Sequence, residues 1–442
     1  MRRSAQARQQ RAQGIGTGRE ITMPLPLGGL FSEAKTSEIS GVYAGEFVNW
    51  ESAGTKIRLR KQAISLSPES AILRRIPYEF GADPRYIEIY ADRAKCGDAE
   101  IIRPFAADCS VAYISGQAII ADGQGFPVRF DGVAFHQIDM DVQGGADPAT
   151  FDGVVAHHDR LFFWATGGEL EFYHSATVGG LQGEFLRFPL GRLGNITGSI
   201  RQMQSLTINA GHGMNDTLAI MTSTGEIVAY EGLDPADAMD WRLLTRVRAS
   251  TPVGPEAFAR IGNDLWMVSG SGIVSIMESI SQGVLALVGN ASRPIVTEIT
   301  ALIEQGGRWQ MHVGADGSQV IVNRIKDGEA KQHVFHVETR TWSVTDYPAA
   351  GFHNLNGKTE FTDMNGRLRR LRRLPPMIWP VPLPTLLQWA LAMCGIWIST
   401  RPLSGRGRGL YSWALMMTQP QREQHGISCR AASRPFWMIV VA

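Results

Sequence analysis

The chain of 442 residues carries 43 basic and 42 acidic side chains, a formal net charge of +1. This balance gives no reason to expect a nucleic-acid coat or a strongly acidic partner, and a hydrophobic content of 44% is ample for a core. The four cysteines, at 96, 109, 394 and 429, include no CxxC pair, which excludes a disulfide-stapled scaffold. With 48 glycines and only 19% charged residues, we expect many tight turns and a mainly β protein.

Residues 1–24 are expected to form a disordered basic arm, with a functional basic arm as the alternative. The first twenty residues contain five Arg and no acid before Glu20, and they lack the apolar segment of a signal peptide. The glycines of GIGTG at 14–18 follow no strand, so they do not form a dinucleotide-binding loop. The ordered protein should begin near Leu25.

Between about residues 70 and 365, short apolar runs alternate with turns rich in Gly, Asp and Asn. Typical turns are Ser223-Thr224-Gly225, Gly262-Asn263-Asp264 and Gly270-Ser271-Gly272. Units of two or three strands recur every 35 to 55 residues or so, a spacing typical of propeller blades. The pattern predicts an irregular β-propeller over 25–368. A tandem of β-sandwiches is the alternative, and the number of blades stays open.

A helical insertion near 280–306 interrupts the strands. Pro294 suits the first turn of a helix, and Gly306-Gly307 would end it. Ile295, Ile299 and Ile303 are spaced four apart and would form a narrow apolar stripe. We therefore expect a packing helix between two blades.

Residues 369–442 have a different composition from the rest. From 370 onward there are nine Arg, no Lys, no Asp and one Glu, together with five of the eleven Trp. The stretch 375–400 has no charge over 26 residues, which is long enough to span a membrane, but five prolines in its first ten residues oppose a helix. We expect an aberrant, out-of-frame or unstructured tail, with a membrane anchor as the alternative.

Two histidine pairs could suggest metal binding. His157 and His158 precede Asp159, but neighbours on a strand face opposite ways, so hydrogen bonding at a loop end is the favoured interpretation. His333 and His336 are an odd number of residues apart and should also point to opposite faces. Neither pair has a third ligand at a helpful spacing, so zinc is not expected.

The segment IDMDVQGGADPAT resembles part of a calcium-binding loop. Asp139, Asp141 and Gln143 occupy alternate positions, and Gly144 stands sixth. The twelfth position is Thr150 instead of a bidentate Glu, and no helix frames the loop. Calcium is therefore not expected there.

Nothing else in the chain demands catalysis. There is no GxSxG elbow, no phosphate-binding loop and no sialidase-type repeat. We assign no catalytic, cofactor-binding or metal residues and expect a protein that is not an enzyme. The alternatives are a propeller hydrolase acting on glycans, which needs paired carboxylates at one channel mouth, and a glycan- or protein-binding module. A binding module could use an aromatic pocket around Trp241, Trp266 or Trp342, which we expect to pack between blades instead.

Several segments, taken in order, resemble the packaged-DNA stabilization proteins of short-tailed phages, also called tail hubs or nozzles. The segments that carry the resemblance are LPLGGL (25–30), FVNW (47–50), HHDRLFFW (157–164), YEGLDPADAMDW (230–241), ARIGNDLWMVSGSGIVSI (259–276), and the strands between 308 and 344. The similarity covers about residues 25–368. Each motif is degenerate, and the ordered set is the specific feature.

The resemblance implies a structural virion protein of the phage tail, present in the host cytoplasm during assembly. It implies an irregular propeller that forms a homo-oligomeric ring, most often of six copies, below the portal and adaptor. Packaged double-stranded DNA would be retained by this ring and would pass through it at ejection without sequence recognition. It also implies further acidic strands after NGRLRRL (365–371), and their loss would leave the propeller incomplete.

The neutral total charge hides two unlike parts. Residues 370–442 contribute nine Arg and one Glu, so residues 1–369 hold 34 basic and 41 acidic side chains, a net charge of −7. A mildly acidic body suits a conduit through which DNA slides without sticking.

Overall fold

The computed structural model describes residues 25–33, 42–81, 83–192, 196–209, 214–283, 286, 292–373, 397–401 and 412–416. It divides into two compact units. One unit is Pro24–Arg373, and the other comprises Met1–Met23 and Leu374–Ala442. In the second unit β31 (Trp397–Arg401) pairs with β32 (Ser412–Met416). The expectations for residues 1–24 and for nearly all of 374–442 lie outside the described residues.

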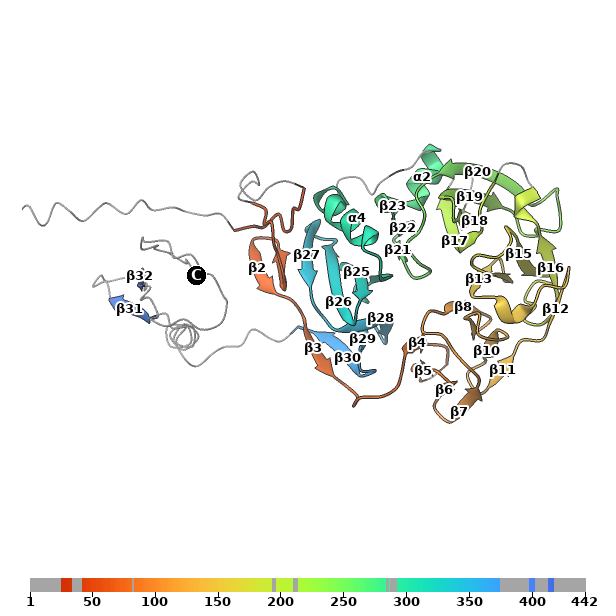
Figure 1. Cartoon of the computed structure of the whole chain (residues 1–442), viewed down its shortest axis with the longest axis horizontal. Coiled ribbons are helices and arrows are strands. Elements are labelled where there is room, and N and C mark those ends of the chain that lie inside the picture. Colours follow the sequence, from red (N-terminus) through yellow and green to blue (C-terminus); the bar gives the residue numbers. More distant parts are fainter. Residues whose placement is uncertain are drawn as a thin grey trace, which may run out of the picture. The chain divides into compact units, whose positions relative to one another are not determined.

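Seven antiparallel sheets, numbered here as blades in chain order, form a β-propeller in the unit Pro24–Arg373 (Figure 1). The first blade consists of β4 (Arg74–Tyr78), β5 (Arg85–Ile89), β6 (Arg93–Cys96) and β7 (Ala99–Ile102), and the second of β8 (Ser110–Ile114), β9 (Gln117–Ala121), β10 (Val128–Phe130) and β11 (Phe135–Gln137). The third consists of β13 (Gly153–His157), β14 (Arg160–Trp164), β15 (Phe172–Ser175) and β16 (Gly183–Phe188), with β12 (Met140–Val142) added parallel to β16. The fourth consists of β17 (Ile200–Asn209), β18 (Met214–Thr222), β19 (Glu226–Glu231) and β20 (Arg242–Arg248).

The fifth blade consists of β21 (Phe258–Ile261), β22 (Asp264–Ser269) and β23 (Gly272–Ser275). The sixth consists of β24 (Arg308–Val313), β25 (Gln319–Lys326), β26 (Glu329–His336) and β27 (Thr341–Thr345). The seventh consists of β28 (Ala349–Leu355), β29 (Lys358–Asp363), β30 (Leu368–Arg372) and β3 (Gln62–Ser65). The prediction of a mainly β propeller is therefore confirmed, and the β-sandwich alternative is wrong. Short 3-10 helices lie at Pro148–Thr150 (η1), Leu190–Arg192 (η2) and Arg293–Ile295 (η3).

The seventh blade is completed by a strand from the other end of the chain. β3 pairs antiparallel with β30, with Ile64 opposite Arg370. The blade therefore has four strands without any residue after 373. This corrects the expectation that the ring depends on further strands after 371. The compact unit ends at Arg373, slightly beyond residue 368, where the propeller was expected to end.

The segment before β3 covers the sixth blade. Leu30 donates its backbone N–H to Trp342 O, and Val48 bridges to Val344. The hairpin of β1 (Trp50–Ala53) and β2 (Lys56–Leu59) follows. The LPLGGL motif needs glycine at 29, since its φ is +75° and a Cβ would lie 2.6 Å from Trp342 O. The N-terminal segment thus joins the sixth and seventh blades.

The predicted helical insertion lies between the fifth and sixth blades, and its described residues include the helices α2 and α4. α2 (Ile276–Gln282) starts at Ser275, whose side chain caps Glu278 N–H, and ends at Gly283. α4 (Val296–Glu304) follows η3, and Gly306 and Gly307 come directly after it. The apolar stripe of this helix packs against residues of both blades as expected, with Ile299 buried and Ile303 partly buried.

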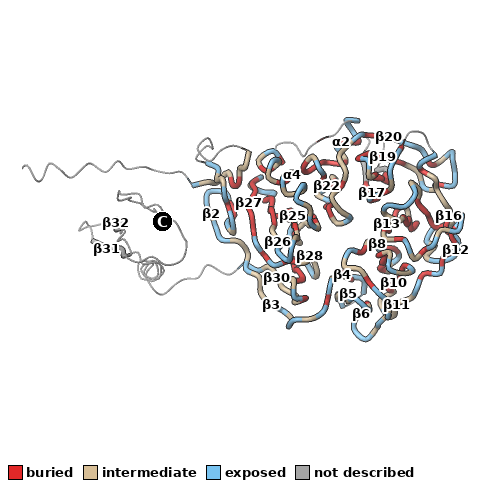
Figure 2. Tube along the Cα trace, in the orientation of Figure 1, coloured by how far each residue is buried: buried red, intermediate tan, exposed pale blue. Residues whose placement is uncertain are grey.

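The core consists of hydrophobic clusters between successive blades, and buried segments run through the strands of every blade (Figure 2). The junction of the seventh and first blades is polar instead. Buried Arg75 donates to Gly366 O at 2.9 Å, and Tyr86 Oη donates to Glu360 Oε2 at 2.5 Å. Hydrogen bonds therefore close the ring between the last blade and the first.

Candidate functional site

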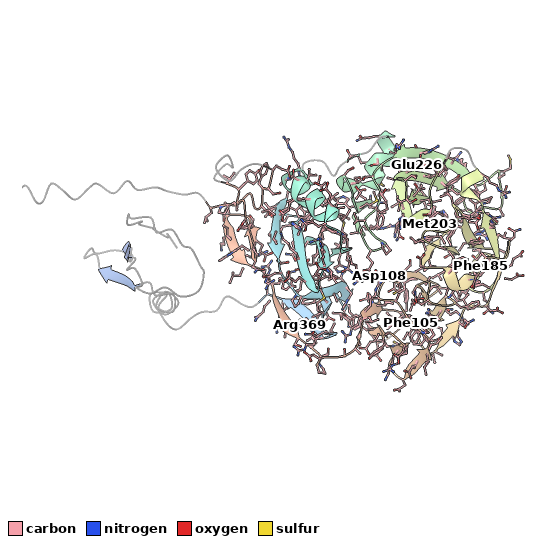
Figure 3. All side chains as sticks on the ribbon, viewed as in Figure 1. Phe105, Asp108, Phe185, Met203, Glu226 and Arg369 are labelled. Atoms are coloured by element: carbon pink, nitrogen blue, oxygen red, sulfur yellow. The ribbon has the colours of Figure 1, made fainter. Side chains whose placement is uncertain are left out.

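The first strand of every blade lines a central channel with a volume of about 600 Å³. β4, β8, β13, β17, β21, β24 and β28 each contribute side chains to it. In Figure 3 the labelled Asp108, two residues before β8, lies near the middle of the ring. A channel of this size, lined by all seven inner strands, is the first place to look for chemistry.

Charged side chains bridge this channel where the inner strands begin. Glu256, just before β21, accepts from Arg74 Nη2 of β4 at 2.6 Å through Oε1. Its other oxygen accepts from Arg308 Nη2 of β24 at 2.8 Å. Arg308 also pairs with Asp108 and donates to Ala350 O at 2.8 Å. The network joins the first and second blades to the fifth, sixth and seventh.

The electrostatics of this network favour full charge on the arginine of the first blade. Burial lowers the pKa of Arg74, but its interactions with Cys109 and with the Glu256 carboxylate raise that pKa above its ordinary value. Arg74 Nη1 also donates to Cys109 O at 2.5 Å. Both oxygens of Glu256 are thus occupied by guanidinium groups.

Neutral polar groups of the channel wall join neighbouring blades. The Gln310 amide donates to Phe352 O at 2.9 Å and accepts from Phe352 N at 2.7 Å. His312 Nε2 lies 2.9 Å from Asn354 Oδ1, and burial lowers the pKa of His312. These contacts tie β24 to β28, so their polar atoms are used in holding the sixth and seventh blades together.

The HHD segment forms a turn between β13 and β14. His157 is buried and its Nδ1 lies 2.8 Å from Ser205 Oγ of the fourth blade, while burial lowers its pKa to about 3. The ring of His158 lies 4.3 Å from that of His157 between centroids. The hydrogen bond of His157 agrees with the favoured interpretation of a loop-end role, and the two rings come into contact because His158 and Asp159 have positive φ angles and lie on the turn.

Arg160, the next residue, links two of the segments that carry the family resemblance. It donates from Nη1 to Ser175 O and Ala176 O, each at 2.7 Å, and from Nη2 to Asp234 Oδ2 at 2.8 Å. Asp234 belongs to the loop between β19 and β20. Trp241, at the end of that loop, stacks on Tyr230 with centroids 5.3 Å apart. HHDR and GLDPADAMDW therefore meet at the junction of the third and fourth blades.

The calcium-like segment folds as a strand and a turn. Asp141 lies on β12, and Gly144 and Gly145 have positive φ angles. Gln143 Oε1 accepts from Arg187 N at 3.0 Å, and Thr150 ends η1. Asp139 accepts a backbone hydrogen bond from Gly183 through its carbonyl oxygen. Across the described ranges no group of three or more His, Cys, Asp or Glu is placed to hold a metal ion.

The second histidine pair lies on β26 and its members contact different elements. His333 Nε2 lies 3.0 Å from Glu298 Oε1 of α4, whereas His336 Nε2 lies 2.8 Å from Ser343 Oγ and its Nδ1 is 3.4 Å from Glu51. This separation agrees with their odd spacing. The three tryptophans weighed as an aromatic pocket are all buried, as expected for blade packing: Trp241, Trp266 and Trp342.

Sequence reasoning missed the residues of the channel network. Arg74 and Arg308 are the first residues of inner strands, and Glu256 and Asp108 lie two residues before inner strands. In the sequence each is a charge beside an apolar run, and nothing local sets it apart. If the blades had been similar enough in sequence to align on one another, the alignment would have placed these four residues at one end of the channel.

The fold and the channel define a seven-bladed β-propeller. No family model matches the chain, and no curated protein matches its sequence. Solved structures that are similar to it include YCF48 bound to D1 peptide, with a TM-score of 0.41 and 11% identity over 74% of this chain and 98% of that one. The WD40 β-propeller domain of Doa1 has a TM-score of 0.39 and 10% identity over 71% of this chain and 97% of that one.

BamB from Moraxella catarrhalis gives a TM-score of 0.35 and 10% identity over 71% of this chain and 97% of that one. These likenesses are too weak to assign a function. In the described part of the chain, no helix is long and apolar enough to cross a membrane.

Proposed function

We propose that the protein is a structural component of a phage virion, a propeller subunit of the tail ring that retains packaged DNA and passes it at ejection. Its place would be the tail, reached after assembly with portal and adaptor in the host cytoplasm. The ordered motifs resembling packaged-DNA stabilization proteins are the first support. The structure places two of those motifs at one blade junction through Arg160 and Asp234.

The observation that carries the proposal is the network across the channel. Arg74, Glu256, Arg308 and Asp108 occupy the end of the channel where the inner strands start. The groups best suited to chemistry are therefore engaged in fixing blades to one another. A rigid body of this kind suits a subunit that acts through its outer surfaces.

The same network argues against DNA passing along the axis of one propeller. A duplex whose major groove alone is about 12 Å wide does not fit a bridged channel. In the proposal DNA passes instead through the opening surrounded by several copies. Residues 1–369, with a net charge of −7, would repel the duplex and limit sticking.

Glycan hydrolysis is less well supported by this geometry. A glycosidase needs one protonated carboxyl and one free carboxylate on either side of the scissile bond. The two acids at the channel mouth, Asp108 and Glu256, are both paired with Arg308, and Glu256 also pairs with Arg74. Both oxygens of Glu256 are thus engaged by arginines, and Asp108, whose side chain is half exposed, is paired through one oxygen.

The proposal is tested by removing the gene from the phage that carries it and measuring DNA in the particles. We expect heads that package DNA and then lose it, so that nuclease digests the genome of particles lacking this protein and spares that of complemented particles. Particles that lack the protein yet keep a nuclease-resistant genome would contradict the proposal.

A further inference from the structure

Three of the four arginines that line the central channel are ion-paired, and the fourth is not. Arg74, Arg75 and Arg308 each pair with a carboxylate. Arg260, on β21, is exposed and forms no salt bridge to any described residue. Within the described part of the chain its guanidinium makes a single hydrogen bond, from Nη2 to Ser205 O. Arg260 therefore supplies the channel with an unpaired positive charge and unused donors.

Arg260 stands away from the braced end of the channel. It lies four residues after Glu256, and an extended chain rises about 3.3 Å per residue, so the two are separated by about 13 Å along the wall. Tyr113 occupies the corresponding part of β8, five residues after Asp108, and is 39% exposed. The Glu256 side chain, by contrast, is only 10% exposed. The channel is thus more open to solvent at the end where Arg260 and Tyr113 lie.

Two glutamines share the wall with Arg260. Gln202 and Gln204 lie on β17, and both line the channel. The cross-strand partners of these glutamines and of Arg260 belong to one core cluster, which packs between the fourth and fifth blades. Residues opposite each other in an antiparallel pair lie on the same face of the sheet. Gln202, Gln204 and Arg260 therefore face the same gap, from its two sides.

Gln202 carries a buried acceptor that lacks a donor. This residue is 5% exposed, and its Nε2 donates to Pro255 O at 3.2 Å. Its Oε1 is buried and forms no hydrogen bond with any described residue. The amide of Gln204, which is partly buried, also makes no hydrogen bond within the described ranges. Because an unpaired buried acceptor is unfavourable, a ligand that donates a hydrogen bond to Gln202 gains affinity.

We infer that this wall of the channel binds a small hydroxylated carboxylate, of the kind that sugar acids such as uronic acids provide. Arg260 binds the carboxylate through paired N–H donors. Hydroxyl groups of the ligand donate to Gln202 Oε1 and exchange hydrogen bonds with the Gln204 amide. A neutral sugar leaves the guanidinium without its counter-charge, and a simple anion leaves the Gln202 oxygen without a donor.

The size of the channel agrees with such a ligand. Its volume of about 600 Å³ lies within the range of about 300–1,000 Å³ that is usual for small-molecule sites. The charges at the braced end neutralise one another, which leaves Arg260 to select the charge of the ligand. The inference goes beyond the proposed function and does not depend on ring formation.

Calorimetric titration of the full chain with glucuronate tests the site. Glucose, acetate and inorganic phosphate serve as comparison probes, since each lacks either the charge or the hydroxylated ring of a sugar acid. We expect glucuronate to bind roughly tenfold or more tightly than any of the three, because only glucuronate satisfies both Arg260 and Gln202.

Two variants divide the contributions of the carboxylate and the hydroxyls. Arg260→Met should weaken glucuronate binding roughly tenfold or more and bring it to the level of glucose. Gln202→Met should weaken glucuronate binding and leave acetate binding unchanged, since acetate has no hydroxyl to donate. The matched control is Arg248→Met, at an exposed arginine of β20 outside the channel, and it should bind like the wild type. Melting temperatures verify that the variants are folded.

The possible results are decisive for the site. Glucuronate that does not bind, or that binds Arg260→Met as tightly as the wild type, would overturn the inference. Phosphate or acetate that binds as tightly as glucuronate would show a simple anion site and would overturn the assignment of a hydroxylated ligand. These results leave the proposed function standing, since that function is tested by DNA retention in particles.

Discussion

Arg74 and Glu256 are joined by a 2.6 Å ion pair that crosses the central channel from the first blade to the fifth. Two blades lie between them along the ring, so the pair acts as a cross-brace. Arg308 extends it to the sixth blade from the other carboxylate oxygen. The brace thus connects the first blade to the fifth and sixth across the channel, in addition to the polar junction that closes the ring.

Removal of the shared carboxylate should destabilise the propeller. Glu256→Gln leaves Arg74 and Arg308 without their common counter-charge in a mostly buried site. We expect a loss of about 2–3 kcal/mol in the free energy of unfolding, measured by urea denaturation. The control Glu69→Gln breaks the exposed pair with Arg367 and should cost less than about 1 kcal/mol. Equal losses in the two variants would contradict a bracing role.

Removal of Arg160 should also lower the free energy of unfolding, because this residue connects the third and fourth blades. Arg160→Met removes the donors for Ser175 O and Ala176 O and leaves Asp234 unpaired. We expect a loss of about 3 kcal/mol. Arg242→Met removes an exposed arginine that pairs with Glu231 nearby and should change the unfolding free energy by less than about 1 kcal/mol. An unchanged urea midpoint in Arg160→Met would refute the assignment.

Gly29 offers a test of the N-terminal cover on the sixth blade. Gly29→Ala adds a Cβ 2.6 Å from Trp342 O at a φ of +75°. Gly54→Ala is a matched control, since its φ is +66° and nothing lies within 4 Å of the added Cβ. We expect Gly54→Ala to cost about 1 kcal/mol from backbone strain alone. Gly29→Ala should cost clearly more and expose the N-terminal segment to protease, and equal costs would argue against the close contact.

Buried histidines should make the protein sensitive to mild acid. Burial lowers the pKa of His157 to about 3, and burial lowers those of His174 and His336 to about 4. The unfolded chain takes up protons near pH 6.5, while the folded chain resists them. Stability is therefore fully present above pH 6.5 and falls as the pH drops toward 4, by at most about 1.4 kcal/mol per pH unit for each histidine.

The melting temperature measured from pH 7.5 to 4 checks this direction. His174→Phe should flatten the decline, since His174 packs with its ring centroid 5.9 Å from that of Phe162, and a phenyl ring does not titrate. A melting temperature independent of pH over that range would contradict the account.

Local signals made the strands and turns predictable. Gly225, Gly262 and Gly272 all have positive φ angles in turns between successive strands, as their sequence context indicated. Pro294 and the Gly306-Gly307 pair marked, for the same reason, the start and the end of the segment that forms η3 and α4, whereas α2 begins earlier, at Ile276. These residues act through their own backbone preferences, which a sequence displays directly.

Contacts between distant segments were not predictable. Ile64 pairs with Arg370 across almost the whole unit, and no local pattern records such a partnership. Charges such as Asp108 and Glu256 look like ordinary solvent-facing residues until the ring brings them beside Arg308. The resemblance to tail proteins included Asp234 and Trp241 only as parts of a motif. It did not indicate that these residues lie at the junction of the third and fourth blades.

Electron microscopy of the purified full chain tests the central claim most directly. We expect closed rings of a single size, most often with six subunits, whose opening is wide enough for a DNA duplex. The propellers should be visible as separate subunits around that opening. Single propellers at every protein concentration, alone and with portal and adaptor present, would contradict the account.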